Sequence, residues 1–201
     1  MDSSPAGALF CPGCGTRLVE QVIDHRPRRL CPACGWVHWR NAKPCAGALI
    51  IRNGKVLLIR RAIEPFRGYW DIPGGFCEVD EHPTQTAIRE AREETGLEIE
   101  LTGLLGLWCD EYASSATLNV YYLARPLTRR LCAGDDAGGA AWFAPQALPW
   151  RIAFANGRLA LAAWTAGTDT PVHLRGAHPS PESRRENIGT GQGRWINRRP
   201  G

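Results

Sequence analysis

Two kinds of segment are lacking in this chain of 201 residues: a long apolar run and an apparent export signal. No apolar run approaches the roughly 20 residues that a helix needs to cross a bilayer. The first residues, MDSSPAGALF, contain no basic stretch followed by an apolar core, so we expect no signal peptide. Both absences argue against a membrane role, and we expect a cytoplasmic protein.

The composition, with 44% hydrophobic residues, suits one ordinary globular core together with a small second unit. The formal charge is +4, and much of the excess lies in the tail. Residues 178–201 are rich in Arg, Pro and Gly and contain almost no large apolar side chains. Such a segment cannot bury enough surface to offset chain entropy, so we expect residues 1–8 and 167–201 to be disordered. A nucleic-acid-binding role for the basic tail is open but not favoured.

Four of the eight cysteines form two close pairs, Cys11-Pro-Gly-Cys14 and Cys31-Pro-Ala-Cys34. Without an export signal, disulfide bonds explain this pattern poorly. The spacing is typical of a zinc ribbon, in which four thiolates hold Zn²⁺ and leave no open position for catalysis. A glycine follows each pair and allows the backbone to turn back toward the sulfurs. We therefore predict a structural zinc ribbon over residues 9–40, stabilised by its metal.

Two other interpretations of this region stay open, a redox pair and a nucleic-acid-binding ribbon. The second rests on a mixture of basic and aromatic residues. A structural appendage to the next domain is at least as well supported. Histidines here are expected at the surface, because four thiolates already complete a zinc site. The residues concerned are His25, Arg26, Arg28, Arg29, Trp36, His38, Trp39 and Arg40.

The four single cysteines, Cys45, Cys77, Cys109 and Cys132, lie on or near predicted strands. Buried and inert thiols are the default expectation for such positions.

The rest of the chain predicts a mixed sheet with helices on it. Asn53-Gly54 separates the apolar runs 45–51 and 55–61, which is a strong hairpin signal. A short segment, Tyr69 to Pro73, then leads to a glycine pair. Further strands are expected at 98–110, 117–125 and 140–143, and a closing helix at 156–164 capped by Asn156.

A helix is expected between Pro83, which suits a first helical turn, and Gly96, which suits the position after the last one. Glu90, Glu93 and Glu94 would share one face of it, where they repel each other unless a cation lies between them. Oxygen ligands of this kind suit Mg²⁺ or Mn²⁺. The opposite, apolar face would consist of Ala87, Ile88 and Ala91.

The stretch from Gly75 to Leu97 resembles the Nudix box, Gly-x5-Glu-x7-Arg-Glu-U-x-Glu-Glu-x-Gly-U, where U is apolar. All fixed positions of the box match. The resemblance implies an α/β/α sandwich over residues 41–166, in which the box forms a loop, a helix and a loop. It also implies hydrolysis of a nucleoside diphosphate linked to a second group. The matching residues are Gly75, Glu81, Arg89, Glu90, Glu93, Glu94 and Gly96.

By position in the box, Glu90 and Glu94 are expected to be the principal metal ligands. Glu93 is expected to be a further ligand or the base that activates water. The carbonyl of Gly74 commonly completes the metal shell in the family. Glu81 and Arg89 are expected to pair with each other and hold the loop on the helix.

Contacts to substrate are less well defined by the sequence. Arg60 and Arg61 end a strand before the box, and a cation there can hold a phosphate; a solvated strand end is the alternative. Trp70 belongs to the family pattern Trp-x-x-Pro-Gly-Gly and is expected in the core. Weaker candidates for an adenine platform are Phe66, Trp108, Tyr112 and Phe154. Asp135 and Asp136 are candidates for an additional catalytic carboxylate.

A cysteine ribbon joined to a Nudix domain resembles plant FAD and ADP-ribose pyrophosphatases over about residues 9–165. The NADH pyrophosphatase group carries Ser-Gln-Pro-Trp-Pro-Phe-Pro-x-Ser after the box, and this chain lacks it. The resemblance therefore favours ADP-ribose or FAD as a small-molecule substrate. An NADH or NAD-cap hydrolase is the alternative enzyme, and a binding-only regulator is the alternative of another class. A homodimer is left open.

Overall fold

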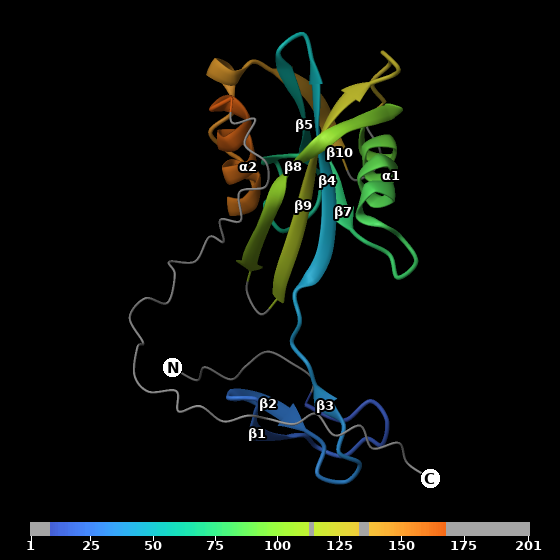
Figure 1. The fold of residues 1–201 in the computed structure, drawn as a ribbon, viewed down its shortest axis with the longest axis vertical. Coiled ribbons are helices and arrows are strands. Elements are labelled where there is room, and N and C mark those ends of the chain that lie inside the picture. The colour runs from blue at the N-terminus through green and yellow to red at the C-terminus, as the bar shows by residue number, and fades with distance from the viewer. Residues whose placement is uncertain (1–8, 113–114, 133–136, 168–201) are drawn as a thin grey trace.

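The structure is a computed structural model that describes residues 9–112, 115–132 and 137–167. The segments expected to be disordered, residues 1–8 and nearly all of the tail, lie outside the described residues, as do Asp135 and Asp136. Figure 1 shows a small unit at the N-terminal side and a larger sheet flanked by two helices. In the described part of the chain, no helix is both long and apolar enough to cross a membrane.

The small unit is a three-stranded antiparallel sheet of β1 (Val19–Ile23), β2 (Arg26–Leu30) and β3 (Val37–His38). Asp24 and His25 form the turn between the first two strands, and both adopt positive φ. A core this small contains little more than Cys11, Leu18 and Cys31, with Trp36 packed against them. So few buried side chains contribute little stability, and a metal held by the cysteines would supply more.

The larger unit contains one mixed sheet of seven strands in the order β10-β5-β4-β9-β8, with β6 beside β5 and β7 beside β4. The pair β4–β9 is parallel, and the other pairs are antiparallel. The sheet therefore brings β4, at the start of the domain, beside a strand about 70 residues later in the chain. The strands are β4 (Lys43–Arg52), β5 (Lys55–Arg61), β6 (Trp70–Asp71), β7 (Gly74–Phe76), β8 (Ile99–Tyr112), β9 (Ser115–Pro126) and β10 (Ala137–Phe143).

Helices α1 (Pro83–Thr95) and α2 (Ala155–Thr165) cover opposite faces of this sheet, and a single 3₁₀ turn, η1 (Pro145–Ala147), precedes α2 (Figure 1). Alternating residues of β4 explain the two layers, because successive side chains of a strand point to opposite faces. Ala46, Ala48 and Ile50 pack with α1, whereas Leu49 belongs to the cluster that contacts α2. The predicted α/β/α sandwich is confirmed.

Residues that the sequence predicted to form turns or helix ends do so at three places. Asn53 and Gly54 both have positive φ in the turn between β4 and β5, as a tight hairpin of this type requires. Pro83 occupies the first turn of α1. Gly96 ends α1 in the left-handed conformation, with its N–H donating to the carbonyl of Arg92 at 2.8 Å.

Two details of the helices were predicted wrongly. Asn156 does not cap α2, because the helix begins one residue earlier and Phe154 occupies the cap position. Ile88 is 36% exposed, whereas Ala87 and Ala91 are fully buried. Thr86 and Thr95 complete the buried face of α1 instead. Thr95 can be buried because its hydroxyl donates a hydrogen bond to the carbonyl of Ala91.

The expectation that the single cysteines are buried is correct for only some of them. Cys45 is buried and Cys77 half-buried. Cys109 and Cys132 are exposed, because they occupy a solvent-facing strand position and the segment after β9.

Candidate active site and zinc centre

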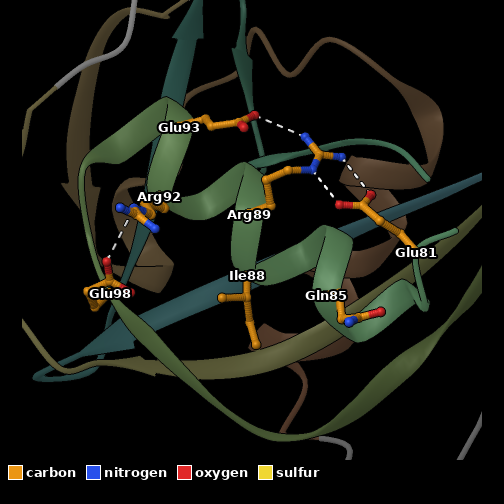
Figure 2. Close-up of a pocket in the computed structure, with 7 residues that line it drawn as sticks. All are labelled: Glu81, Gln85, Ile88, Arg89, Arg92, Glu93 and Glu98. Atoms are coloured by element: carbon orange, nitrogen blue, oxygen red, sulfur yellow. Dashed lines mark hydrogen bonds and ion pairs between the residues drawn. The ribbon is translucent and has the colours of Figure 1, made fainter. Parts of the chain in front are cut away.

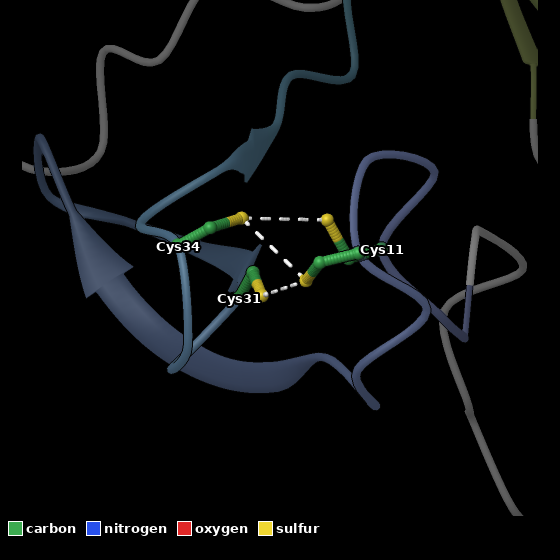
Figure 3. Close-up of side chains that lie close together, drawn as sticks. Cys11, Cys31 and Cys34 are labelled. Carbon is green, nitrogen blue, oxygen red and sulfur yellow. Dashed lines mark hydrogen bonds between the residues drawn. The ribbon is translucent and has the colours of Figure 1, made fainter.

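The four cysteines of the small unit converge on one point. Their Sγ atoms all lie within 4.8 Å of one another. The Sγ–Sγ separations are 3.6 Å for Cys11–Cys34, 3.4 Å for Cys14–Cys31 and 3.7 Å for Cys14–Cys34. Figure 3 shows the side chains of Cys11, Cys31 and Cys34 pointing toward one another. A regular tetrahedron with Zn–S bonds of about 2.3 Å has edges of about 3.8 Å. The cluster therefore fits Zn²⁺ in a closed four-thiolate site.

Two equivalent turns build this cluster. Gly15 and Gly35 both have positive φ, and each donates its N–H to the carbonyl of the first cysteine of its pair at 2.9 Å. Neither turn needs a histidine: His25 is exposed, and His38 stacks on Trp36 with ring centres 5.8 Å apart. Among the described residues, the four cysteines are the one set of three or more His, Cys, Asp or Glu side chains close enough to share an ion.

Helix α1 directs two of its three glutamates into a pocket beside the sheet. Glu90 and Glu94, one helical turn apart, both line this pocket together with Gly74 and Gly75 of β7. The N–H of Gly74 donates to a carboxylate oxygen of Glu94 at 2.9 Å. Burial raises the pKa of Glu94 to about 8 and also raises the pKa of Glu90. A cation would reverse this effect by stabilising the charged carboxylates.

Both glycines of β7 lie where an added side chain would meet close neighbours. A Cβ atom at Gly75 would lie 2.2 Å from Oε1 of Glu90. A Cβ atom at Gly74 would lie 2.7 Å from the carbonyl oxygen of Ala46 in the neighbouring strand. The sequence had indicated close approach of a metal at Gly74; the structure adds close approach of strand β4. Gly75 thus keeps room for the Glu90 carboxylate, and Gly74 allows β4 to approach β7 closely.

The third glutamate, Glu93, points elsewhere. Its side chain is 56% exposed and accepts a hydrogen bond from Arg89 at 2.9 Å. Figure 2 shows it on the outer side of α1, where an open groove of about 620 Å³ runs past Glu81, Arg89 and Glu98. The three carboxylates therefore do not converge on one cavity in this structure, because position 93 is rotated away from the line joining 90 and 94.

Arg89 is the cation that compensates the acidic cluster. Its guanidinium contacts Glu81 at 2.6 Å, Glu90 at 2.8 Å and Glu93 at 2.9 Å. It also donates to the carbonyl of Phe76 at 3.1 Å. The predicted pair of Glu81 and Arg89 is thus present, and it ties the loop of the box to the helix.

The residues around Glu90 and Glu94 suit a hard divalent cation. Two half-buried carboxylates supply oxygen ligands of the kind that Mg²⁺ and Mn²⁺ prefer. The space kept free by Gly75 lies directly against the Glu90 carboxylate. Of the residues predicted to bind metal, Gly74, Glu90 and Glu94 share the pocket, and Glu93 does not line it.

The pocket has a volume of about 580 Å³ and contains one well-held cation, Arg61. Its Nη1 lies 3.3 Å from Asp71, its Nε donates to the carbonyl of Pro65 at 2.8 Å, and its Cζ lies 5.0 Å from the centre of the Phe154 ring. Arg60 instead points away, donating to the carbonyl of Gly68 at an exposed position. Alternation along β5 separates these two neighbouring arginines.

The aromatic residues predicted as candidate adenine platforms also divide into residues at the pocket and residues in the core. Phe154 lines the pocket, and Phe66 packs edge-on against it with ring centres 5.2 Å apart. Trp108 is only 4% exposed and belongs to the core, so its prediction as a platform was wrong. Trp70 packs on Phe143 at 4.8 Å, in agreement with its expected core role. The side chain of Tyr112 lies outside the described residues.

Sequence reasoning missed several polar residues of the pocket, among them Asp71, Asp110, Asn119 and Tyr121. Asp71 is 7% exposed, and burial raises its pKa to about 6 against the opposing effect of Arg61. One signal was available, since a charged or amide residue inside an apolar strand needs a partner. The sequence could not predict which of these residues would become neighbours, because that depends on the order of the strands in the sheet.

Comparison with known proteins agrees with this architecture. A family profile described as NUDIX domain matches residues 42–164, and a profile described as Nudix N-terminal matches residues 9–40. The chain belongs to the Nudix family. A crystal structure of a NUDIX hydrolase from Nitrosomonas europaea has 29% sequence identity to it and a TM-score of 0.73. That similarity covers 84% of this chain and 98% of the other.

Two relatives carry more specific names. An ADP-ribose pyrophosphatase of Methanocaldococcus jannaschii is 35% identical over 108 residues, which cover 53% of this Nudix chain and 63% of the relative. An NAD-capped RNA hydrolase of Pseudomonas aeruginosa is 30% identical over 142 residues, which cover 70% of this chain and 49% of the relative. This chain therefore spans about half to two thirds of the length of these relatives.

Proposed function

We propose that this Nudix protein is a divalent-metal-dependent pyrophosphohydrolase that cleaves an ADP-containing diphosphate, such as ADP-ribose or FAD, and releases AMP. Residues 41–166 would carry the reaction, and the ribbon at 9–40 would be a structural zinc unit. One observation supports the proposal most directly: two half-buried carboxylates, Glu90 and Glu94, line the same pocket as Arg61.

The carboxylates and the carbonyl of Gly74 would hold Mg²⁺ or Mn²⁺. A bound ion would neutralise the charge of the diphosphate and lower the pKa of a water molecule. Arg61 would bind a phosphate oxygen through the guanidinium N–H groups that Asp71 and Pro65 leave free. Because three contacts already fix this side chain, little conformational entropy is lost when substrate binds.

Glu93 remains the candidate for the base that accepts a proton from water. It does not line the pocket, but Nη1 of Arg89 donates to its carboxylate at 2.9 Å and to that of Glu90 at 2.8 Å, which keeps Glu93 next to a pocket carboxylate. Arg89 and Glu81 would support this arrangement from the loop without touching the substrate. Phosphoryl transfer depends mainly on positioning and charge stabilisation, which these fixed contacts supply.

The choice of an ADP-containing substrate is supported by the named ADP-ribose pyrophosphatase relative and by the missing downstream motif of NADH pyrophosphatases. An NADH or NAD-cap hydrolase is the second candidate, favoured by similarity to an NAD-capped RNA hydrolase over 70% of this chain. A binding-only regulator would not need to keep two half-buried carboxylates with a glycine, Gly75, that makes room for one of them, Glu90.

A substrate panel tests the proposal. Purified protein with Mg²⁺ or Mn²⁺ is offered ADP-ribose, FAD, NADH, ADP-glucose, diadenosine polyphosphates and nucleoside triphosphates, and AMP release is measured. We expect turnover of ADP-ribose or FAD and a loss of about 100-fold or more in Glu94→Gln and Glu93→Gln. Glu98→Gln, on the outer groove, is the matched control and should retain activity.

The proposal fails if no compound is hydrolysed and Glu93→Gln behaves as the wild type. Preferred turnover of NADH would instead establish the second candidate.

A further inference from the structure

One wall of the pocket consists of polar side chains from strands β8 and β9. Asp110 pairs with Thr117, and Trp108 pairs with Asn119, in a regular part of the antiparallel register. Side chains two residues apart on a strand share a face, so Asp110 and Asn119 are diagonal neighbours on it. Both line the pocket, and neither belongs to the Nudix box.

The orientation of the Asn119 side-chain amide is determined by its neighbours. Its Nδ2 donates to the hydroxyl of Thr117 at 2.8 Å and to the carbonyl of Trp108 at 3.4 Å. Both N–H groups are therefore directed toward the protein. The residue is only 8% exposed, and its carbonyl oxygen is the group left to accept a hydrogen bond from a ligand.

Asp110 provides a second acceptor beside it. One carboxylate oxygen faces the backbone N–H of Asn156 in the first turn of α2, at 3.5 Å. Within the part of the chain that the structure describes, the other oxygen has no hydrogen-bond donor. The wall thus presents two acceptors, an amide oxygen and a carboxylate oxygen, next to each other.

We infer that Asp110 and Asn119 read an exocyclic amino group on the base of the substrate, which makes Asp110 a specificity-determining residue. The inference rests on the proposed nucleotide-diphosphate function. An amino group offers two N–H donors, one for each acceptor. A carbonyl at the same position of the base would meet two oxygen atoms and leave both without a donor.

Adenine and hypoxanthine differ at this position, where adenine has an amino group and hypoxanthine a carbonyl. Leaving a buried polar group unpaired should lower kcat/KM by about 10- to 100-fold. We therefore expect the wild type to hydrolyse ADP-ribose about 10- to 100-fold more efficiently than IDP-ribose. The difference should appear in binding as well as in turnover.

Asp110→Asn provides the decisive variant. Its carbonyl oxygen can still accept from the N–H of Asn156, which turns its NH₂ group toward the base. The variant should therefore lose efficiency on ADP-ribose and gain it on IDP-ribose, bringing the ratio to within about threefold of one. A gain on IDP-ribose cannot result from misfolding. Glu111→Gln makes the same chemical change at the adjacent, exposed position and should leave the ratio unchanged.

Calorimetric binding of AMP and IMP separates this inference from the proposed function, because it needs no turnover. Preference for AMP in the wild type, lost in Asp110→Asn and kept in Glu111→Gln, supports the inference even if neither diphosphate is hydrolysed. Equal binding of AMP and IMP by the wild type overturns it. An equal loss on both substrates in Asp110→Asn, with the ratio unchanged, also overturns it and would assign Asp110 to the diphosphate or metal.

Discussion

Glu81 and Arg89 form a two-point contact between the loop and the helix of the Nudix box. Nε of Arg89 lies 2.6 Å from one carboxylate oxygen of Glu81, and Nη2 lies 2.9 Å from the other. The hydroxyl of Thr86 adds a third donor at 2.9 Å. The same guanidinium reaches Glu90, so the loop, the helix and one pocket carboxylate are held by one side chain.

This contact should make stability depend on pH in the acid range. Hydrogen bonds from Arg89 lower the pKa of Glu81 from 4.5 to about 2. Because the folded-state pKa is depressed, the stabilisation is fully present above pH 4.5 and is lost as the pH falls toward 2. Glu81→Gln should therefore lower the melting temperature at pH 7, and the difference from wild type should vanish near pH 2. Thermal unfolding between pH 2 and 7 measures this.

Glu98→Gln is the control for that series. Its partner Arg92 lies 3.4 Å away with both side chains more than half exposed, so little change is expected at any pH. A constant difference between Glu81→Gln and wild type at all pH values would contradict the assigned role of the ion pair.

Gly75→Ala should weaken metal binding through a purely steric effect. The added Cβ would overlap the Glu90 carboxylate, which must then leave its place. We expect Mn²⁺ affinity to fall about 10-fold or more and kcat to fall with it. Gly103→Ala is the matched control, since no atom lies within 4 Å of the Cβ it would add. Electron paramagnetic resonance of free Mn²⁺ measures the affinity, and unchanged binding in Gly75→Ala would refute the placement of the ion.

Substitution of Arg61 or of its neighbour Arg60 by alanine should have different effects on KM. Arg61→Ala removes a guanidinium from the pocket, and we expect KM for ADP-ribose to rise about 10- to 100-fold. Arg60→Ala removes one that points to Gly68 and should change KM by less than about threefold. Steady-state kinetics on both variants tests the assignment. Similar effects of the two substitutions would show that Arg61 does not bind phosphate.

The cysteine cluster should contain about one zinc ion per chain. Cys31 is fully buried in the small core, so Cys31→Ser should release the metal and unfold the ribbon. Cys109→Ser, at an exposed single cysteine, should keep its zinc. Elemental analysis by mass spectrometry gives the zinc content of both. Loss of zinc in Cys109→Ser, or retention in Cys31→Ser, would contradict a site made of the four paired cysteines.

Local features were predictable because each depends on residues close together in the chain. The turn at Asn53-Gly54, the ends of α1 at Pro83 and Gly96, and the zinc knuckles all follow from backbone preferences or ligand spacing. Helix α2 shows the limit of such reasoning. Asn156 is a good capping residue, yet the helix starts at Ala155, and the backbone N–H of Asn156 faces Asp110 instead.

The sequence by itself determined that the chain carries a Nudix box after a four-cysteine ribbon, since spacing alone defines both. Only the tertiary structure decided which of these residues share a pocket. Helix rotation directs Glu90 and Glu94 inward and leaves Glu93 on the outer side with Arg89. Strand order brings Arg61, Asp110 and Asn119 to the same cavity from three strands. Neither relationship is encoded by local spacing, because both depend on contacts between segments far apart in the chain.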